Sequence, residues 1–274
     1  MTDKKPERTQ ELHVDIDAPL EAAWKAITEG PGIANWFAPI AEVSGEGVGA
    51  TVTAGWTEEM MMSQTVSESE PLQHVRWLDE SGWMGEGTTM TLDYYLTTEN
   101  GKTRVRLVQS GFGASDGWDD LFEGTETGWT YFLENLRIYL ERHQGRTRHM
   151  TFDRIQVEMP RAAFWRHLLS DASGFVVGGS GSATVGQSLA VRLDPASAPM
   201  RAVVEMVVEN QGIGLRIPEL TDALLFVELE GRKDKFHVGY WLSIYDDAQS
   251  KALAGPAKSA FRRIHEALTL RTSD

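Results

Sequence analysis

The sequence contains an internal repeat at an offset of 141 residues. Residues 14–27 read VDIDAPLEAAWKAI, and residues 155–168 read IQVEMPRAAFWRHL. Both stretches begin with alternating apolar residues, continue with a proline and place a tryptophan five residues after it, at Trp24 and Trp165. A shared pattern of this kind indicates one structural unit used twice. We therefore expect two tandem copies of a single fold.

The length of 274 residues is sufficient for two ordinary domains, because domains usually contain about 100–200 residues. The polar segment 145–149, GRTRH, separates the two copies. We therefore predict a first domain at 1–145 and a second, divergent domain at 150–274. Residues 1–147 carry the whole net charge of −14 and seven of the nine tryptophans, so we expect the two domains to differ in task.

The first copy reads as a strand, a helix, several strands and a closing helix. Leu12, Val14 and Ile16 alternate with polar residues, which is typical of a half-buried strand. Asn100-Gly101 predicts a tight hairpin turn. Further strand-like segments occur at 51–53, 64–69, 74–78, 89–97 and 103–109. The closing helix has an apolar stripe at Trp129, Phe132, Leu133, Leu136 and Leu140.

The second copy repeats this order with weaker turn signals. Its strand-like segments lie at 187–193, 201–209, 212–217, 223–230 and 235–245. Gly255-Pro256 predicts the start of the final helix, because proline is tolerated in a first helical turn. Both copies therefore predict an α+β fold, an antiparallel sheet curved around a long C-terminal helix. Such an arrangement can leave a cavity between the sheet and the helix.

Five motifs of the first copy occur in an order that is typical of a known family. They are Asp17-Ala18-Pro19 with Trp24, ITEGPGIANWFAP at 27–39, SESEPLQHVRW at 67–77, TRVRLVQSGF at 103–112 and GTETGWTYFLENLRIYLE at 124–141. By these motifs, nearly all of residues 10–143 resemble the START-like, or SRPBCC, helix-grip superfamily, in its branch of bacterial homologues of the activator of the heat-shock protein 90 ATPase. The second copy resembles the superfamily only through residues 152–169 and the closing helix.

The resemblance implies tandem helix-grip domains and a ligand cavity. Helix-grip members bind hydrophobic or aromatic small molecules, and some relatives are cyclases, hydrolases or sequestering resistance proteins. Related eukaryotic domains assist the chaperone's ATPase, but they do so beside a separate chaperone-binding domain that these residues do not show. The resemblance therefore favours a ligand over a chaperone partner.

Aromatic residues of the first copy are the candidate ligand-binding residues. A pocket lined by aromatic rings suits a flat apolar ligand, although aromatic side chains are also common in an ordinary core. Both interpretations stay open at this stage. The ten candidates are Trp36, Phe37, Trp56, Trp77, Trp83, Tyr94, Phe112, Trp118, Trp129 and Phe132.

The sequence predicts no metal site and no cofactor. It has no cysteine, and its seven histidines form no metal-binding pair. The acidic turn with Asp116, Asp119 and Asp120 precedes the closing helix, where carboxylates stabilise the helix N-terminus. The negative charge disfavours nucleic acid and anionic membrane surfaces. We also expect a cytoplasmic location, because neither an apolar signal segment nor a membrane-spanning stretch is evident.

The leading hypothesis is a non-catalytic protein whose first domain binds a small hydrophobic or aromatic molecule. The second domain would then act as a structural partner or an interaction surface. The first alternative is a cyclase-like or hydrolase-like enzyme that uses Asp93 or Glu86 with His74 in the same cavity. The second alternative is a co-chaperone or regulatory module.

Overall fold

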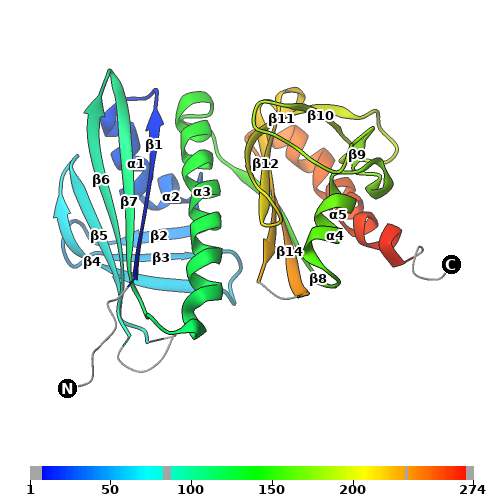
Figure 1. Cartoon of the computed structure of the whole chain (residues 1–274). Helices are drawn as coiled ribbons and strands as arrows, with labels where there is room; N and C mark the ends of the chain where they lie inside the picture. Colours follow the sequence, from blue (N-terminus) through cyan, green and yellow to red (C-terminus); the bar gives the residue numbers. More distant parts are fainter. Residues whose placement is uncertain (1–7, 83–87, 232–233, 270–274) are drawn as a thin grey trace. The chain divides into compact units, whose positions relative to one another are not determined.

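The computed structural model describes residues 8–82, 88–231 and 234–269. The chain divides into two compact units, Met1–Arg146 and Thr147–Asp274 (Figure 1). Each unit contains a seven-stranded sheet in which every neighbouring pair of strands is antiparallel, and each ends in a long helix. The predicted fold class, α+β with tandem helix-grip domains, is confirmed.

In the first unit, the sheet has the strand order β1-β7-β6-β5-β4-β3-β2. Strands β2 to β7 form a meander, and the first strand completes the sheet beside the last one. The elements are β1 (Arg8–Ile16), α1 (Leu20–Thr28), α2 (Gly30–Ala34), β2 (Ile40–Ser44), β3 (Thr51–Gly55), β4 (Met61–Glu70), β5 (His74–Asp79), β6 (Met90–Glu99), β7 (Lys102–Phe112), the 3-10 turn η1 (Asp116–Trp118) and α3 (Asp119–Arg142).

The β6–β7 hairpin forms where the sequence predicts it. Asn100 and Gly101 both have positive φ, 52° and 78°, which is the backbone conformation that a two-residue hairpin turn requires. Glu99 then pairs with Lys102, and the register continues without interruption to Thr91 and Ser110. This register fixes which side chains of β6 and β7 face the core.

Helix α3 covers the inner face of the first sheet. Its leucines at 133, 136 and 140 are buried, as their helical spacing predicts. Asn135, with no exposed surface, donates from Nδ2 to the backbone oxygen of Trp36 at 2.6 Å. This hydrogen bond ties the middle of α3 to the segment that follows α2.

In the second unit, the strand order β8-β14-β13-β12-β11-β10-β9 repeats the topology of the first. The tandem copies inferred from the sequence are therefore present. The elements are β8 (His149–Glu158), α4 (Arg161–Leu168), η2 (Asp171–Ser173), β9 (Val176–Val177), β10 (Ser188–Val191), β11 (Met200–Val208), β12 (Gly212–Ile217), η3 (Pro218–Leu220), β13 (Ala223–Glu230), β14 (Lys235–Ile244) and α5 (Asp247–Thr269).

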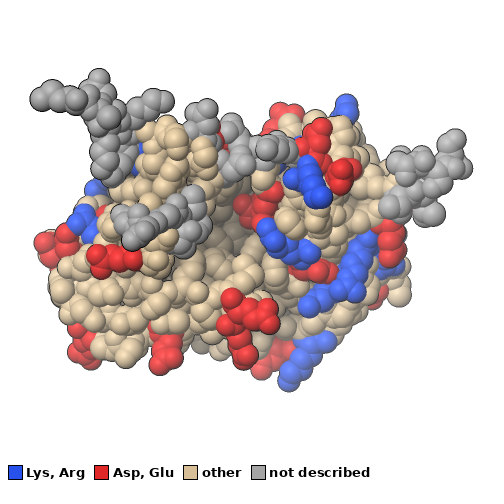
Figure 2. Space-filling model, turned by 90° about the horizontal axis from the view of Figure 1, so that it is seen from below, with Lys and Arg blue, Asp and Glu red and all other residues tan. Residues whose placement is uncertain are grey.

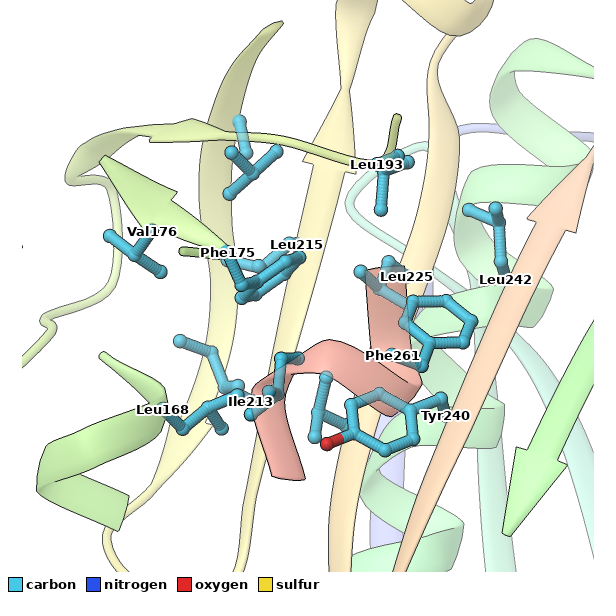
Figure 3. Packing of buried hydrophobic residues seen from close by; sticks show 14 of the residues in the cluster. Leu168, Phe175, Val176, Leu193, Ile213, Leu215, Leu225, Tyr240, Leu242 and Phe261 are labelled. Carbon is cyan, nitrogen blue, oxygen red and sulfur yellow. The ribbon is translucent and has the colours of Figure 1, made fainter. Parts of the chain in front are cut away.

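The core of the second unit lies between its sheet and α5 (Figure 3). Phe261 of α5 stacks on Tyr240 of β14 with ring centroids 4.6 Å apart. Leu215 and Leu225 are fully buried in the same cluster, and Phe175 is 1% exposed. The second unit is therefore filled mainly by aliphatic side chains, which agrees with its small number of tryptophans.

The predicted start of the final helix at Gly255-Pro256 is wrong. Helix α5 begins at Asp247, and Pro256 lies inside it. Asp246 caps the N-terminus of the helix, since its side chain accepts a hydrogen bond from the backbone N–H of Gln249 at 2.9 Å. A proline in a helix interior removes one backbone hydrogen bond, and the helix nevertheless continues because residues such as Ala257 and Phe261 bury its apolar face.

Charge is distributed unequally between the units. Residues 1–147 contain 11 Lys and Arg against 25 Asp and Glu, whereas residues 148–274 contain 15 of each sign. On the face drawn in Figure 2, basic side chains gather mainly over the second unit. Across the part of the chain that the structure describes, no helix is both long enough and apolar enough to cross a membrane.

Candidate ligand-binding site

Seven of the ten candidate aromatic residues form one contiguous group, here called the aromatic cluster. Phe37 lies at its centre, with ring centroids 4.8 to 5.5 Å from those of Phe132, Trp129 and Trp56. Tyr94 joins the group through Trp36, at 6.3 Å. The aromatic cluster consists of Trp36, Phe37, Trp56, Trp77, Tyr94, Trp129 and Phe132.

The other three candidates lie elsewhere. Phe112 and Trp118 belong to a separate group with Phe122. The ring centroid of Phe112 lies 6.5 Å from that of Trp118 and 5.1 Å from that of Phe122. Trp83 lies outside the described residues. No spacing in the sequence distinguishes these three positions from the members of the aromatic cluster.

Two indole groups in the aromatic cluster have hydrogen-bond partners within the fold. Trp36 donates from Nε1 to the backbone oxygen of Ala26 at 2.8 Å, and Trp129 donates from Nε1 to Oε1 of Gln109 at 2.6 Å. Buried indole N–H groups normally need such a partner. These two tryptophans therefore hold α2 and α3 in place.

A cavity of about 610 Å³ opens in the first unit between the α1–α2 segment and the inner face of β2 to β5. One valine from each of these four strands lines it, because alternate residues of a strand face the same side. Trp24 lies on the helical side and Trp77 on the sheet side. The lining valines are Val43, Val52, Val66 and Val75.

Trp77 connects this cavity to the aromatic cluster. Its side chain has no exposed surface, and its Nε1–H has no hydrogen-bond partner within the described residues. The ring of Tyr94 lies edge-on at 5.0 Å, and its hydroxyl also lacks a partner there. Burial raises the pKa of Tyr94 well above its usual value of 10, so the hydroxyl keeps its proton. Two unsatisfied donors thus lie at or near the cavity wall.

The mouth of the cavity carries acidic groups. Glu29 precedes α2 and Glu46 lies in the β2–β3 turn, and both are exposed lining residues. Among the described residues that line the cavity there is no lysine, arginine or histidine. The valines thus lie beside polar residues such as Thr28 and Ser69, and the exposed charges of the lining are negative.

The pair named by the enzymatic alternative lies on the opposite face of the sheet. His74 Nε2 and Asp93 Oδ1 are 2.7 Å apart, and Arg76 Nε donates to the same carboxylate oxygen at 2.8 Å. Because Val75 and Trp77 face the cavity, His74 and Arg76 face away from it. Glu86 lies outside the described residues.

His74 is covered although it lies on the outer face. The ring of Tyr95 stacks on it at 4.4 Å, and only 8% of the histidine is exposed. Arg106 in turn lies over the Tyr95 ring at 4.1 Å. The arrangement joins neighbouring strands by stacking and ion pairs, without an open space for a substrate.

The acidic turn before α3 takes part in a local ion pair. Asp119 Oδ1 accepts from Arg8 Nη1 at 2.6 Å, which joins the start of α3 to β1. No group of three possible His, Asp or Glu metal ligands occurs in the described segments.

The first unit is a helix-grip domain, since a curved meander sheet packs around one long C-terminal helix. The cavity lies beside α1 and α2, and no residue of α3 lines it, in contrast to the expectation of a cavity between the sheet and the closing helix. Residues 17–141 match the family described as Activator of Hsp90 ATPase homolog 1-like protein. This part of the first unit is therefore similar to that family, as its motifs predict.

Several solved structures are similar to this chain. The Aha1 dimer from Colwellia psychrerythraea shares 24% identity over 50% of this chain and 99% of that chain, with a TM-score of 0.41. DynU16, from the dynemicin biosynthetic locus, shares 17% identity over 96% of this chain and 98% of that chain, with a TM-score of 0.42. The di-domain ARO/CYC BexL, from the BE-7585A biosynthetic pathway, shares 14% identity over 97% of this chain and 95% of that chain, with a TM-score of 0.43. A search of curated proteins gave no significant match.

Proposed function

We propose that the first unit is a cytoplasmic, non-catalytic binding domain for a small hydrophobic or aromatic molecule. The observation that carries the proposal is the cavity of about 610 Å³ lined by four valines and two tryptophans. Ligand pockets of proteins have volumes of about 300–1,000 Å³ and mostly apolar walls. Of the aromatic cluster only Trp77 lies at the cavity wall, and the other six rings pack in the core away from it.

The distribution of ionisable groups supports a binding role rather than catalysis. General acid–base catalysis needs a titratable group within hydrogen-bonding reach of the substrate. The buried His74 and Asp93 pair faces away from the cavity, and the acidic lining residues are exposed at its mouth. In this proposal the second unit serves as a structural partner or an interaction surface, because its core is filled by aliphatic side chains.

Blocking the cavity should abolish binding without unfolding the domain. Val66, which is 6% exposed, lines the cavity. We expect Val66→Trp to weaken binding of the neutral fluorescent probe 1-pyrenemethanol at least tenfold, because the larger ring occupies the space of the probe. Fluorescence titration of the full chain measures the affinity.

The neighbouring exposed residue provides the matched control. Thr65 precedes Val66 on β4 and faces the other side of the sheet. Thr65→Trp adds an indole to the same strand and should leave the affinity unchanged. Equal binding by the wild type and both variants would place the probe outside this cavity and contradict the proposal. A milder Val66→Phe variant replaces Val66→Trp if circular dichroism shows that the latter is unfolded.

A panel of lipids and aromatic metabolites can then identify the natural ligand. Native mass spectrometry detects the bound mass, and thermal unfolding detects the stabilisation. A ligand present at one hundred times its Kd should stabilise the domain by about 2.7 kcal/mol. If neither the probe nor any compound of the panel binds, the proposed function fails.

The matched family provides a second candidate function, the regulation of an Hsp90 ATPase. Stimulation of the bacterial chaperone's ATPase by the full chain, measured in a coupled assay, would favour it. An unchanged rate together with probe binding in the cavity would favour the ligand-binding function.

A further inference from the structure

The charges at the cavity mouth restrict the kind of ligand that the cavity can accept. Glu29 and Glu46 are both carboxylates, and no cationic side chain accompanies them in the described part of the lining. Residues 1–147 also carry a net charge of −14. An approaching anion is therefore repelled both at the opening and at longer range, whereas a cation is attracted. Fatty acids and phosphorylated lipids are poor candidates on these grounds.

The aromatic walls add a second preference in the same direction. Trp24 lines the cavity and is partly exposed, whereas the Trp77 ring behind the same wall has no exposed surface. The face of an indole ring attracts a cation, and tryptophan does so more strongly than the other aromatic residues. A positive group near the entrance can thus interact with carboxylates and with a ring face.

We propose that the ligand of the first unit is an amine-bearing apolar molecule, with its positive group at Glu29 and Glu46 and its apolar body between the valines and tryptophans of the cavity. This inference rests on the proposed function, because it requires that the cavity binds a small molecule. The combination describes a cationic aromatic amine rather than a neutral hydrocarbon or a lipid acid.

Three probes with one scaffold and different charges test the inference. They are 1-pyrenemethylamine, which is cationic at neutral pH, 1-pyrenemethanol, which is neutral, and 1-pyreneacetic acid, which is anionic. For the wild-type chain in low salt, we expect the amine to bind about fivefold more tightly than the alcohol, the size that two solvent-facing charge pairs support. The acid should bind most weakly. Raising the salt concentration should reduce the preference, because exposed charges are screened.

The double variant E29Q/E46Q removes the two mouth charges and keeps the side-chain shapes. It should bring the affinities for the amine and the alcohol within about twofold of each other. The matched control is E42Q/E58Q, which changes the net charge equally at two exposed residues that do not line the cavity. This control should keep the preference for the amine.

The outcomes separate the two proposals. Equal affinities of the wild type for all three probes, or tighter binding of the acid, would overturn the amine inference and leave the binding function intact. A preference that E29Q/E46Q and E42Q/E58Q reduce to the same extent would also overturn it, because the net charge rather than the mouth would then be the cause. Absence of binding by every probe would overturn the proposed function itself.

Discussion

Replacing Trp36 by alanine is expected to lower the free energy of unfolding of the first unit by about 3–5 kcal/mol. Trp36 has no exposed surface, and its ring contacts Phe37 and Tyr94. The truncation therefore leaves a cavity in the aromatic cluster. It also leaves the backbone oxygen of Ala26 without the indole donor that lies 2.8 Å away.

The position of Trp36 in the chain increases the expected effect. Its backbone oxygen accepts the buried hydrogen bond from Asn135, so the residue joins the end of α2 to the middle of α3. An effect of this size is a large part of the total stability of an ordinary domain, which is about 5–15 kcal/mol.

Hydrogen exchange followed by mass spectrometry measures the effect unit by unit. A two-domain chain does not unfold in one step, so a single midpoint would be ambiguous. Peptides from the first unit should lose protection in Trp36→Ala, and peptides from residues 147–274 should keep theirs. Trp24→Ala is the matched control, because Trp24 is only half-buried and lines the cavity. A loss below about 1 kcal/mol in Trp36→Ala, or a larger loss in Trp24→Ala, would contradict the prediction.

Periodicity predicted the fold because each domain buries one side of a sheet. The strand at residues 12–16 and the hairpin at Asn100-Gly101 are local patterns, and each is confirmed. The repeat extended the same prediction to the second unit. The short helix α2 and the short strand β2 were not predicted, since five residues are too few for a clear period.

The candidate site was predicted less completely than the fold. A count of aromatic residues indicates where apolar surface accumulates, but the rings of Phe37, Trp129 and Phe132 pack on one another. The lining of the cavity depends on Val52, Val66 and other small side chains that face one another across strands. Each of these valines alternates with polar neighbours, which is the signal that could have identified them. Only the tertiary structure reveals that Glu29 and Glu46 line the same cavity.

The half-buried His265 of the second unit should make this unit sensitive to acid. His265 on α5 forms a hydrogen bond with the hydroxyl of Tyr240 at 2.8 Å and stacks on Phe164 at 5.4 Å. Burial, together with nearby His167, lowers its pKa from 6.5 to about 4, although Asp153 acts in the opposite direction. The imidazole is therefore neutral at pH 7 and can accept a hydrogen bond from the Tyr240 hydroxyl.

The sign of the pH effect follows from the direction of this shift. Between pH 6.5 and 4, the unfolded chain protonates His265 and the folded chain does not. Acidification through this range therefore favours the unfolded state, and the difference amounts to about 3 kcal/mol by pH 4. Above pH 6.5 the imidazole is neutral in both states and contributes no further pH dependence.

A second group titrates in the same unit with the opposite sign. Burial and the neighbouring Glu230 raise the pKa of Glu228 from 4.5 to about 8. The folded state holds this proton more tightly, so Glu228 lowers stability as the pH rises from 4.5 to 8. The pH profile of the wild type is thus a sum of both groups, and the contribution of His265 has to be obtained by difference.

His265→Gln isolates that contribution, because glutamine keeps an acceptor for the Tyr240 hydroxyl and does not titrate. Hydrogen exchange in peptides of the second unit at pH 7 and pH 4.5, corrected for the intrinsic exchange rate at each pH, gives both stabilities. Between pH 7 and pH 4.5, the free energy of unfolding of the second unit should fall by about 2–3 kcal/mol more in the wild type than in the variant. Equal losses would mean that His265 is solvated or already protonated at pH 7. Because the first unit contains no counterpart of the Tyr240 and His265 pair among its described residues, its own exchange should not depend on this substitution. The two copies of one fold would then differ in how their closing helices are held: by packed tryptophans in the first, and by a neutral histidine in the second.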